Sequence, residues 1–92
     1  SQDEDGNFIT IEVKGRLMGA DEVIITKNEV LIGKNRGADH RLALVAIHPD
    51  DPELDQLRYL VDPFRDTPDP GFRVTRLVFD WSRLWVAGGE PS

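Results

Sequence analysis

Two opposite charges lie two residues apart in the segment with the strongest β-strand pattern. The segment runs from Phe8 to Gly15, and the pair is Glu12 and Lys14. Strand side chains alternate between two faces, so the pair shares a face, roughly 6 to 7 Å apart. A carboxylate can bind Mg²⁺, the metal lowers the pKa of its bound water, and an ammonium stabilises negative charge on a phosphate. Glu12, as a metal ligand, and Lys14 are therefore candidate catalytic residues for phosphodiester cleavage.

A second interpretation of this pair is an ordinary exposed ion pair, which contributes little to stability. A single carboxylate is not enough to hold Mg²⁺, and the site would need another from an adjacent strand. The same alternation predicts that Ile9, Ile11 and Val13 point into a core. Phe8 and Thr10 should then share the opposite face with the charged pair. Spacing alone leaves both interpretations of the pair open.

Basic residues in the first half of the chain are candidate contacts for DNA phosphates. They are Arg16, Lys27, Lys34 and Arg36, with Arg41 as a further candidate. The alternative is a solvated helix face, with the last-turn cations interacting with the helix dipole. The net charge of −6 argues against a sequence-independent grip on nucleic acid. A local basic face on an acidic domain remains compatible with DNA binding.

The remaining side chains that could do chemistry carry weaker patterns. His40 and His48 have no second His or Cys at ligand spacing, which indicates loop histidines rather than a zinc site. Trp81 and Trp85 have helical i, i+4 spacing, which indicates packing of a terminal helix more than stacking on bases. An exposed tryptophan pair would instead suggest a docking surface.

Length and composition predict one small globular domain. The chain has 92 residues, 39% of them hydrophobic and 30% charged, and it contains no Cys. No apolar run approaches the roughly 18 residues that a membrane span needs, and the acidic start is unlike a targeting signal. We expect a cytoplasmic protein without a membrane partner, a single domain over 1–92 with a tail at 1–7 and a core at 8–89. We also expect the chain to be a piece of a longer protein.

Local patterns predict an α/β (α+β) fold with a small mixed sheet of about five strands. The strands are expected at residues 8–14, 22–26, 41–47, 57–61 and 72–79, with the first two paired antiparallel and 41–47 buried in the middle. Thr26 and Glu29 form a capping box for one main helix, with Val30, Leu31 and Ile32 on its apolar side and Gly37 at its end. Residues 62–71 should form a surface excursion. Asp80 should cap a short C-terminal helix.

Six segments, in order, resemble a known family of uncharacterised domains. They are 11–16, 19–21, 26–29, 41–45, 58–60 with 62–64, and 74–75 with 79–80. The family occurs at the carboxyl ends of NO VEIN-type proteins and, more closely here, of bacterial Swi/Snf-type helicases. It is considered similar to PD-(D/E)XK nucleases, whose second motif would fall on Glu12 and Lys14. The resemblance therefore implies a partial restriction-endonuclease-like core.

The resemblance also implies a missing partner for the candidate site. In that fold a metal-binding Asp lies on the strand before the Glu-x-Lys strand, whereas Asp3, Glu4 and Asp5 lie in the turn between the two strands. We therefore expect an accessory helicase-associated domain that is inactive by itself and serves DNA handling or intramolecular docking. Mg²⁺ and nuclease activity would belong to the intact parent. Expected partners are the helicase portion of the parent, DNA, and a second copy bound through an open sheet edge.

Overall fold

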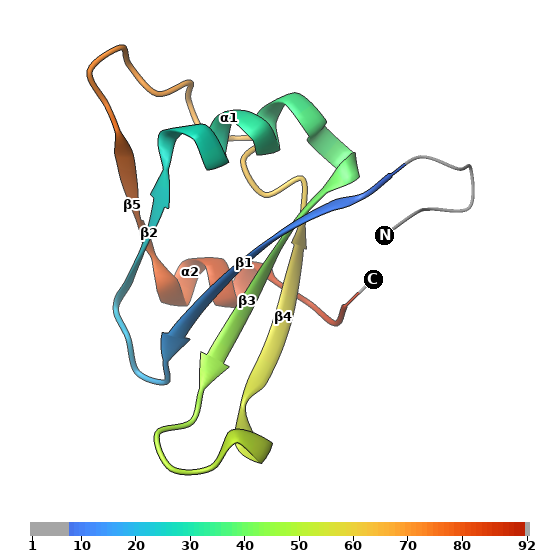
Figure 1. Cartoon of the computed structure of the whole chain (residues 1–92), viewed down its shortest axis with the longest axis vertical. Coiled ribbons are helices and arrows are strands. Elements are labelled where there is room, and N and C mark those ends of the chain that lie inside the picture. The colour runs from blue at the N-terminus through green and yellow to red at the C-terminus, as the bar shows by residue number, and fades with distance from the viewer. Residues whose placement is uncertain (1–7, 92) are drawn as a thin grey trace.

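The computed structural model describes residues 8–91 and contains five strands and two α-helices. The predicted tail at residues 1–7, with its turn acids, lies outside this range. The elements are β1 (Thr10–Leu17), β2 (Glu22–Thr26), α1 (Lys27–Arg36), β3 (His40–Ile47), β4 (Gln56–Val61), β5 (Arg76–Asp80) and α2 (Trp81–Ala87). Short 3-10 helices occur at Gly37–Asp39 and Pro52–Leu54. This order confirms the mixed α/β fold with its main helix after the second strand (Figure 1).

The five strands form two hydrogen-bonded sheets. One has the order β1-β3-β4, in which β1 runs parallel to β3 and β4 runs antiparallel to it; the other is the antiparallel pair β2-β5. The predicted antiparallel pairing of the first two strands is therefore wrong. The reason is that β1 extends to Leu17, beyond the predicted end at residue 14, and α1 acts as the crossover that returns β3 parallel to β1.

Helix α1 begins at the predicted capping box. The backbone N–H of Glu29 donates to Thr26 Oγ1 at 3.2 Å, and Glu29 Oε1 accepts from the Thr26 N–H at 2.8 Å. The helix ends at Gly37, whose φ of 58° favours glycine. Its predicted apolar side is only partly right, because Val30 is fully buried whereas Leu31 and Ile32 are largely exposed.

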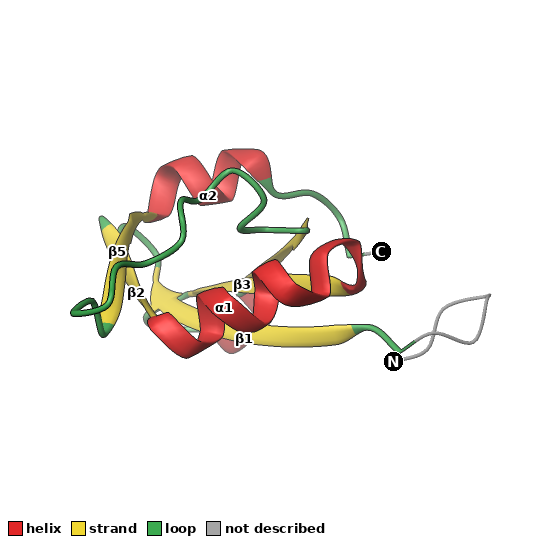
Figure 2. Cartoon of the chain, turned by 90° about the horizontal axis from the view of Figure 1, so that it is seen from above, coloured by secondary structure: helices red, strands yellow, loops and turns green. Residues whose placement is uncertain are grey.

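The core lies between one face of the three-stranded sheet and the remaining elements. Leu42, Leu44 and Ala46 of the central strand β3 point into it, and Leu60 of β4 joins them. Helix α2 lies against this inner side of the sheet, whereas α1 crosses one end (Figures 1 and 2). The prediction that residues 41–47 form the central buried strand is confirmed.

The apolar side chains of β1 point away from the core, contrary to prediction. Ile11 is 39% exposed and Val13 is 59% exposed, while Glu12 and Lys14 lie on the half-buried inner face. The physical reason is the position of β1 at the sheet edge, where its inner face meets the N-terminus of α1 rather than the apolar core.

The register defines an apolar surface that we call the outer face. It comprises the outward positions of three strands: Ile11, Val13, Gly15 and Leu17 of β1, Arg41, Ala43, Val45 and Ile47 of β3, and Leu57, Tyr59 and Val61 of β4. Arg41 is the only charged residue among them. The molecule measures only 17 Å along its shortest axis, in keeping with two layers formed by the sheet and α2. Six apolar side chains of the outer face are at least 37% exposed, whereas the small Ala43 at its centre is buried.

The segment 62–71 contributes to the core as well as to the surface. It lacks helix and strand, as predicted, but Phe64 within it is fully buried and its ring lies 5.8 Å from that of Phe79. The expectation of a purely surface excursion is therefore wrong. The cause is that α1 carries Gly33 where a larger residue would occupy the space of the Phe64 ring.

Helix α2 matches its prediction closely. Asp80 Oδ1 accepts a hydrogen bond from the N–H of Arg83 at 3.1 Å, and Trp81 is only 5% exposed, so the tryptophans pack against the sheet. Within residues 8–91, neither helix has the length and hydrophobicity that a membrane span requires.

Gly33→Ala tests the packing of α1 against Phe64. A Cβ at this position would lie 2.5 Å from Phe64 Cδ2 and 3.1 Å from His40 Cδ2. Alanine improves helix propensity by about 1 kcal/mol, but overpacking costs about 1–3 kcal/mol, so we expect a net destabilisation of about 1 kcal/mol. Urea unfolding should show a lower midpoint. Gly89→Ala, whose Cβ meets nothing within 4 Å, is the control, and an equal effect of both would refute this packing.

Candidate functional site

Three charged side chains from β1 and α1 meet on the inner side of β1. Lys14 Nζ donates to Glu29 Oε1 at 2.8 Å and lies 4.0 Å from Glu12 Oε1. Glu29 and Lys14 are each about one-fifth exposed, and Glu12 about one-third. The structure thus brings Glu12 and Lys14 together, as the sequence predicts, and adds a second carboxylate.

Glu29 was not predicted as a member of this site. From the sequence, Glu29 was expected only in the capping box. It does perform that role, and its Oε1 atom accepts from both Lys14 Nζ and the Thr26 N–H. The signal that could have found it is the capping box itself. The capping box fixes this carboxylate at the helix N-terminus, where a side chain of a nearby strand can contact it.

The pKa values of the Glu12 and Glu29 carboxyl groups lie far apart. A hydrogen bond with Glu29 raises the pKa of Glu12 to about 7, and burial adds to this effect while Lys14 opposes it. Burial acts to raise the pKa of Glu29, but hydrogen bonds from Glu12, Lys14 and Thr26 outweigh it and lower the pKa to about 2. Near neutral pH, Glu12 is therefore able to give or take a proton beside an ionised Glu29.

The side chains at this site meet only part of what Mg²⁺ binding requires. Two carboxylates can hold Mg²⁺ when waters or phosphate oxygens complete its shell, and Glu12 and Glu29 supply two. Lys14, however, already contacts both of them. No group of three or more His, Cys, Asp or Glu residues that could hold a metal ion occurs within residues 8–91. A bound Mg²⁺ would supply water activation and charge neutralisation, while Lys14 would remain as a cation beside a phosphate.

The predicted DNA contacts do not gather around this cluster as free cations. Lys27 donates to the carbonyl of Gly71 at 3.2 Å, and Lys34 lies 3.3 Å from Asp69. Arg36 donates to the Phe8 carbonyl, and Arg41 donates to Ala38 O at 2.6 Å. Their role in DNA binding stays a prediction.

Arg16 differs from these basic residues, because its side chain is exposed and makes no polar contact with other residues in the range 8–91.

The two histidines have different environments. His48 is a loop histidine, as predicted, and its Nδ1 accepts from the N–H groups of Asp50 and Asp51. His40 is instead the first residue of β3 and is 3% exposed, with Nδ1 2.7 Å from Thr10 Oγ1. Burial lowers the pKa of His40, and the charges of Arg36 and Arg41 act in the same direction.

A known protein family matches most of this chain. The family described as "Protein NO VEIN, C-terminal" matches residues 1–60, which include β1, α1 and the cluster of Glu12, Lys14 and Glu29. The chain belongs to this NO VEIN C-terminal family. The match reaches into β4 and stops before β5 and α2. Among curated proteins and among solved structures, none matches this NO VEIN C-terminal domain.

Glu12→Gln tests the coupled carboxyl groups through stability. Because the folded-state pKa of Glu12 is raised from 4.5 to about 7, its stabilising contribution is complete below about pH 4.5 and is lost as pH rises through 7. The one-third exposure of Glu12 screens the interaction, so we expect a loss on the order of 1 kcal/mol. The glutamine variant should lack this loss.

Urea unfolding of both proteins between pH 4.5 and pH 8 measures the difference. The opposite contribution of Glu29 is lost only as pH falls from 4.5 towards 2, so this window avoids it. The effect of His40 is common to both proteins and cancels. Equal pH dependence of the wild type and the variant would contradict the coupling.

Proposed function

We propose that this chain is an accessory domain of a longer, helicase-like protein and that it docks onto the rest of its parent through the outer face. The observation that carries the proposal is the exposed apolar surface of β1, β3 and β4. Parallel strands are normally covered on both faces, and β1 and β3 are parallel. Contiguous exposed apolar surface marks interaction sites. The domain itself catalyses no reaction in this role.

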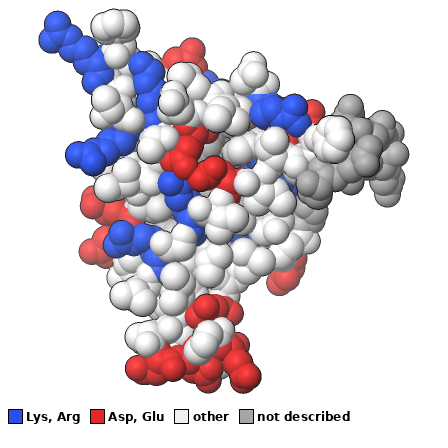
Figure 3. All heavy atoms as spheres, viewed as in Figure 1, with Lys and Arg blue, Asp and Glu red and all other residues white. Residues whose placement is uncertain are grey.

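The charge of the outer face favours a protein partner over DNA. Figure 3 views this side of the molecule, and the area over β1, β3 and β4 is largely free of charged side chains. The one charged residue of the face, Arg41, donates to the carbonyls of Ala38 and His40. DNA binding relies on Lys and Arg contacts to phosphates, which this surface does not offer. The helicase portion of the parent is the partner that the family resemblance suggests.

Hydrogen exchange in the intact parent tests the docking. Amides of β1, β3 and β4 should exchange at least about tenfold more slowly in the parent than in residues 1–92 alone, because a covered sheet opens less often. In the parent, Val13→Lys should remove this protection, since burying an unpaired ammonium is costly.

The matched control is Ile24→Lys on β2, where Ile24 is 48% exposed but lies outside the outer face. It should keep the protection. Identical exchange in the parent and the isolated chain, or equal effects of the two variants, would refute docking through this face.

A second copy is a further partner that we propose, through the edge of β1. Antiparallel pairing centred on Val13 would place Glu12 of each copy opposite Lys14 of the other, which is a favourable cross-strand pair. Such pairing would by itself slow amide exchange in β1 of the isolated chain. The mass of the isolated chain, measured by light scattering, is therefore the control for the exchange experiment. A purely monomeric mass at high concentration would rule out the pairing.

The alternative function is a Mg²⁺-dependent DNA endonuclease in the intact parent, with Glu12 as metal ligand and Lys14 as electrostatic partner. The observation that favours it is the second carboxylate, Glu29, beside a Glu12 whose pKa is about 7. The ligand expected on the preceding strand would complete the site in the parent.

A magnesium titration of residues 1–92 tests whether Glu12 and Glu29 bind metal without a further ligand. Because Lys14 already contacts both carboxyl groups and no third ligand joins them within residues 8–91, we expect no saturable binding, and therefore no difference between the wild type and Glu12→Ala by calorimetry. Saturable binding that Glu12→Ala abolishes would contradict the accessory role and support the endonuclease.

A further inference from the structure

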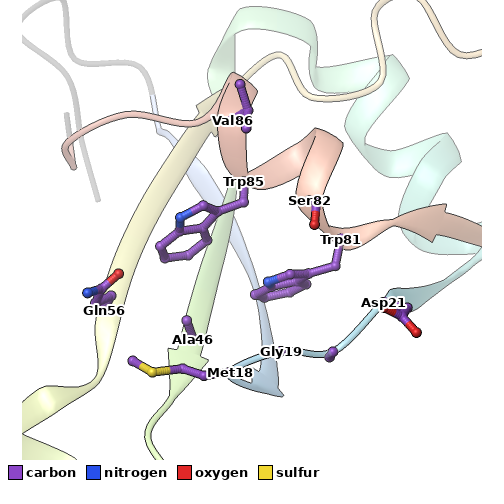
Figure 4. A pocket seen from close by; sticks show the side chains of 10 residues that line it. Met18, Gly19, Asp21, Ala46, Gln56, Trp81, Ser82, Trp85 and Val86 are labelled. Carbon is purple, nitrogen blue, oxygen red and sulfur yellow. The ribbon is translucent and has the colours of Figure 1, made fainter.

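The two tryptophans of α2 wall a cavity on the inner side of the sheet. The cavity has a volume of about 360 Å³, and the residues that matter most around it are Met18, Asp21, Ala46, Gln56, Trp81 and Trp85. Both indoles project from α2 towards β3 and the β1-β2 turn, and Met18 lies across from them (Figure 4). The lining therefore combines apolar walls with a few polar groups, as ligand sites do.

The faces of the indoles are already occupied. The Trp81 and Trp85 rings are stacked with their centroids 5.9 Å apart, and the Arg58 guanidinium lies 4.6 Å from the centre of the Trp85 ring. A nucleobase would need a free ring face on which to stack. The cavity instead offers ring edges, the Met18 thioether and the Ala46 methyl, which suit an aliphatic side chain.

The one charged residue that lines the cavity is acidic, and Arg16, which pairs with Ala46 in the β1-β3 register, flanks it on the same face of the sheet. No Lys or Arg lines it, and Asp21 does. Gln56 directly follows the acidic loop between β3 and β4, which carries Asp50 and Glu53 as exposed carboxylates. Acidic side chains gather at this lower end of the molecule (Figure 3). A partner with Lys or Arg beside its apolar anchor would match this surface in charge.

We propose that this cavity binds an aliphatic side chain carried on a basic segment of a partner protein. The aliphatic side chain fills the space between Met18 and the two indoles. The flanking cations lie over Asp21 and the acidic loop. This surface lies on the opposite side of the sheet from the outer face, so the proposal is independent of docking there.

Intrinsic fluorescence gives a direct test, because Trp81 and Trp85 are the only tryptophans in the chain. The probe is the peptide acetyl-Lys-Lys-Leu-Lys-Lys-amide, and we expect a saturable change in tryptophan emission. Replacing Leu by Ala in the peptide should weaken binding at least about tenfold, because most of the aliphatic side chain that fills the cavity is removed. Replacing the four Lys by Glu should abolish saturation.

Gln56→Lys tests the location, since it adds a cation at the rim of the cavity and should weaken binding of the basic peptide several-fold. Asn35→Lys, an exposed position on α1 away from the cavity, makes the same charge change and should leave affinity unchanged. The proposal is overturned if the Leu and Ala peptides bind equally, if the Glu peptide binds as well as the Lys peptide, or if no peptide gives a saturable change. Equal effects of the two protein variants would also overturn it.

Discussion

The contact of Lys14 with Glu29 joins the edge strand β1 to the N-terminus of helix α1. The ammonium lies 2.8 Å from a carboxylate oxygen that also caps helix α1, so the strand, the helix and the β2-α1 junction share one atom. An ionised capping carboxylate at a helix N-terminus is held by the backbone and by the helix dipole. Because β1 turns its charged residues towards this point, its apolar residues must face the other way.

This orientation connects the candidate site with the exposed surface. The half-buried position of Glu12 beside Glu29 separates the pKa values of the two groups, and the same turn of the strand places Ile11 and Val13 on the outer face. The candidate site and the proposed docking surface thus lie on the two sides of one strand. The parallel pairing of β1 with β3 extends that surface across the whole sheet. This continuous apolar face is the surface that the proposed docking would cover.

Local signals in the sequence predicted both helices and the central strand, whereas the strand predicted at 72–79 begins only at Arg76. The capping box of α1, the Asp80 cap of α2 and the continuous apolar run of β3 depend on neighbouring residues, and all three are confirmed. Strand pairing and strand orientation depend on distant residues. Alternation in β1 shows which residues share a face but not which face meets the core. Glu29 is distant from Lys14 in the sequence, and the two side chains come into contact only when the chain folds. Likewise, no local sequence pattern predicts that the Phe64 ring packs against Gly33.

The most direct test of this account is the titration of the Glu12 and Glu29 side-chain carboxyl groups in the folded chain, followed residue by residue by NMR. The account predicts that Glu12 titrates with a pKa of about 7 and Glu29 with a pKa of about 2. Titration of both groups near the unperturbed value of 4.5 would contradict it. In that case Glu12 and Glu29 would not be coupled, and the charged face of β1 would not be held against α1 as described.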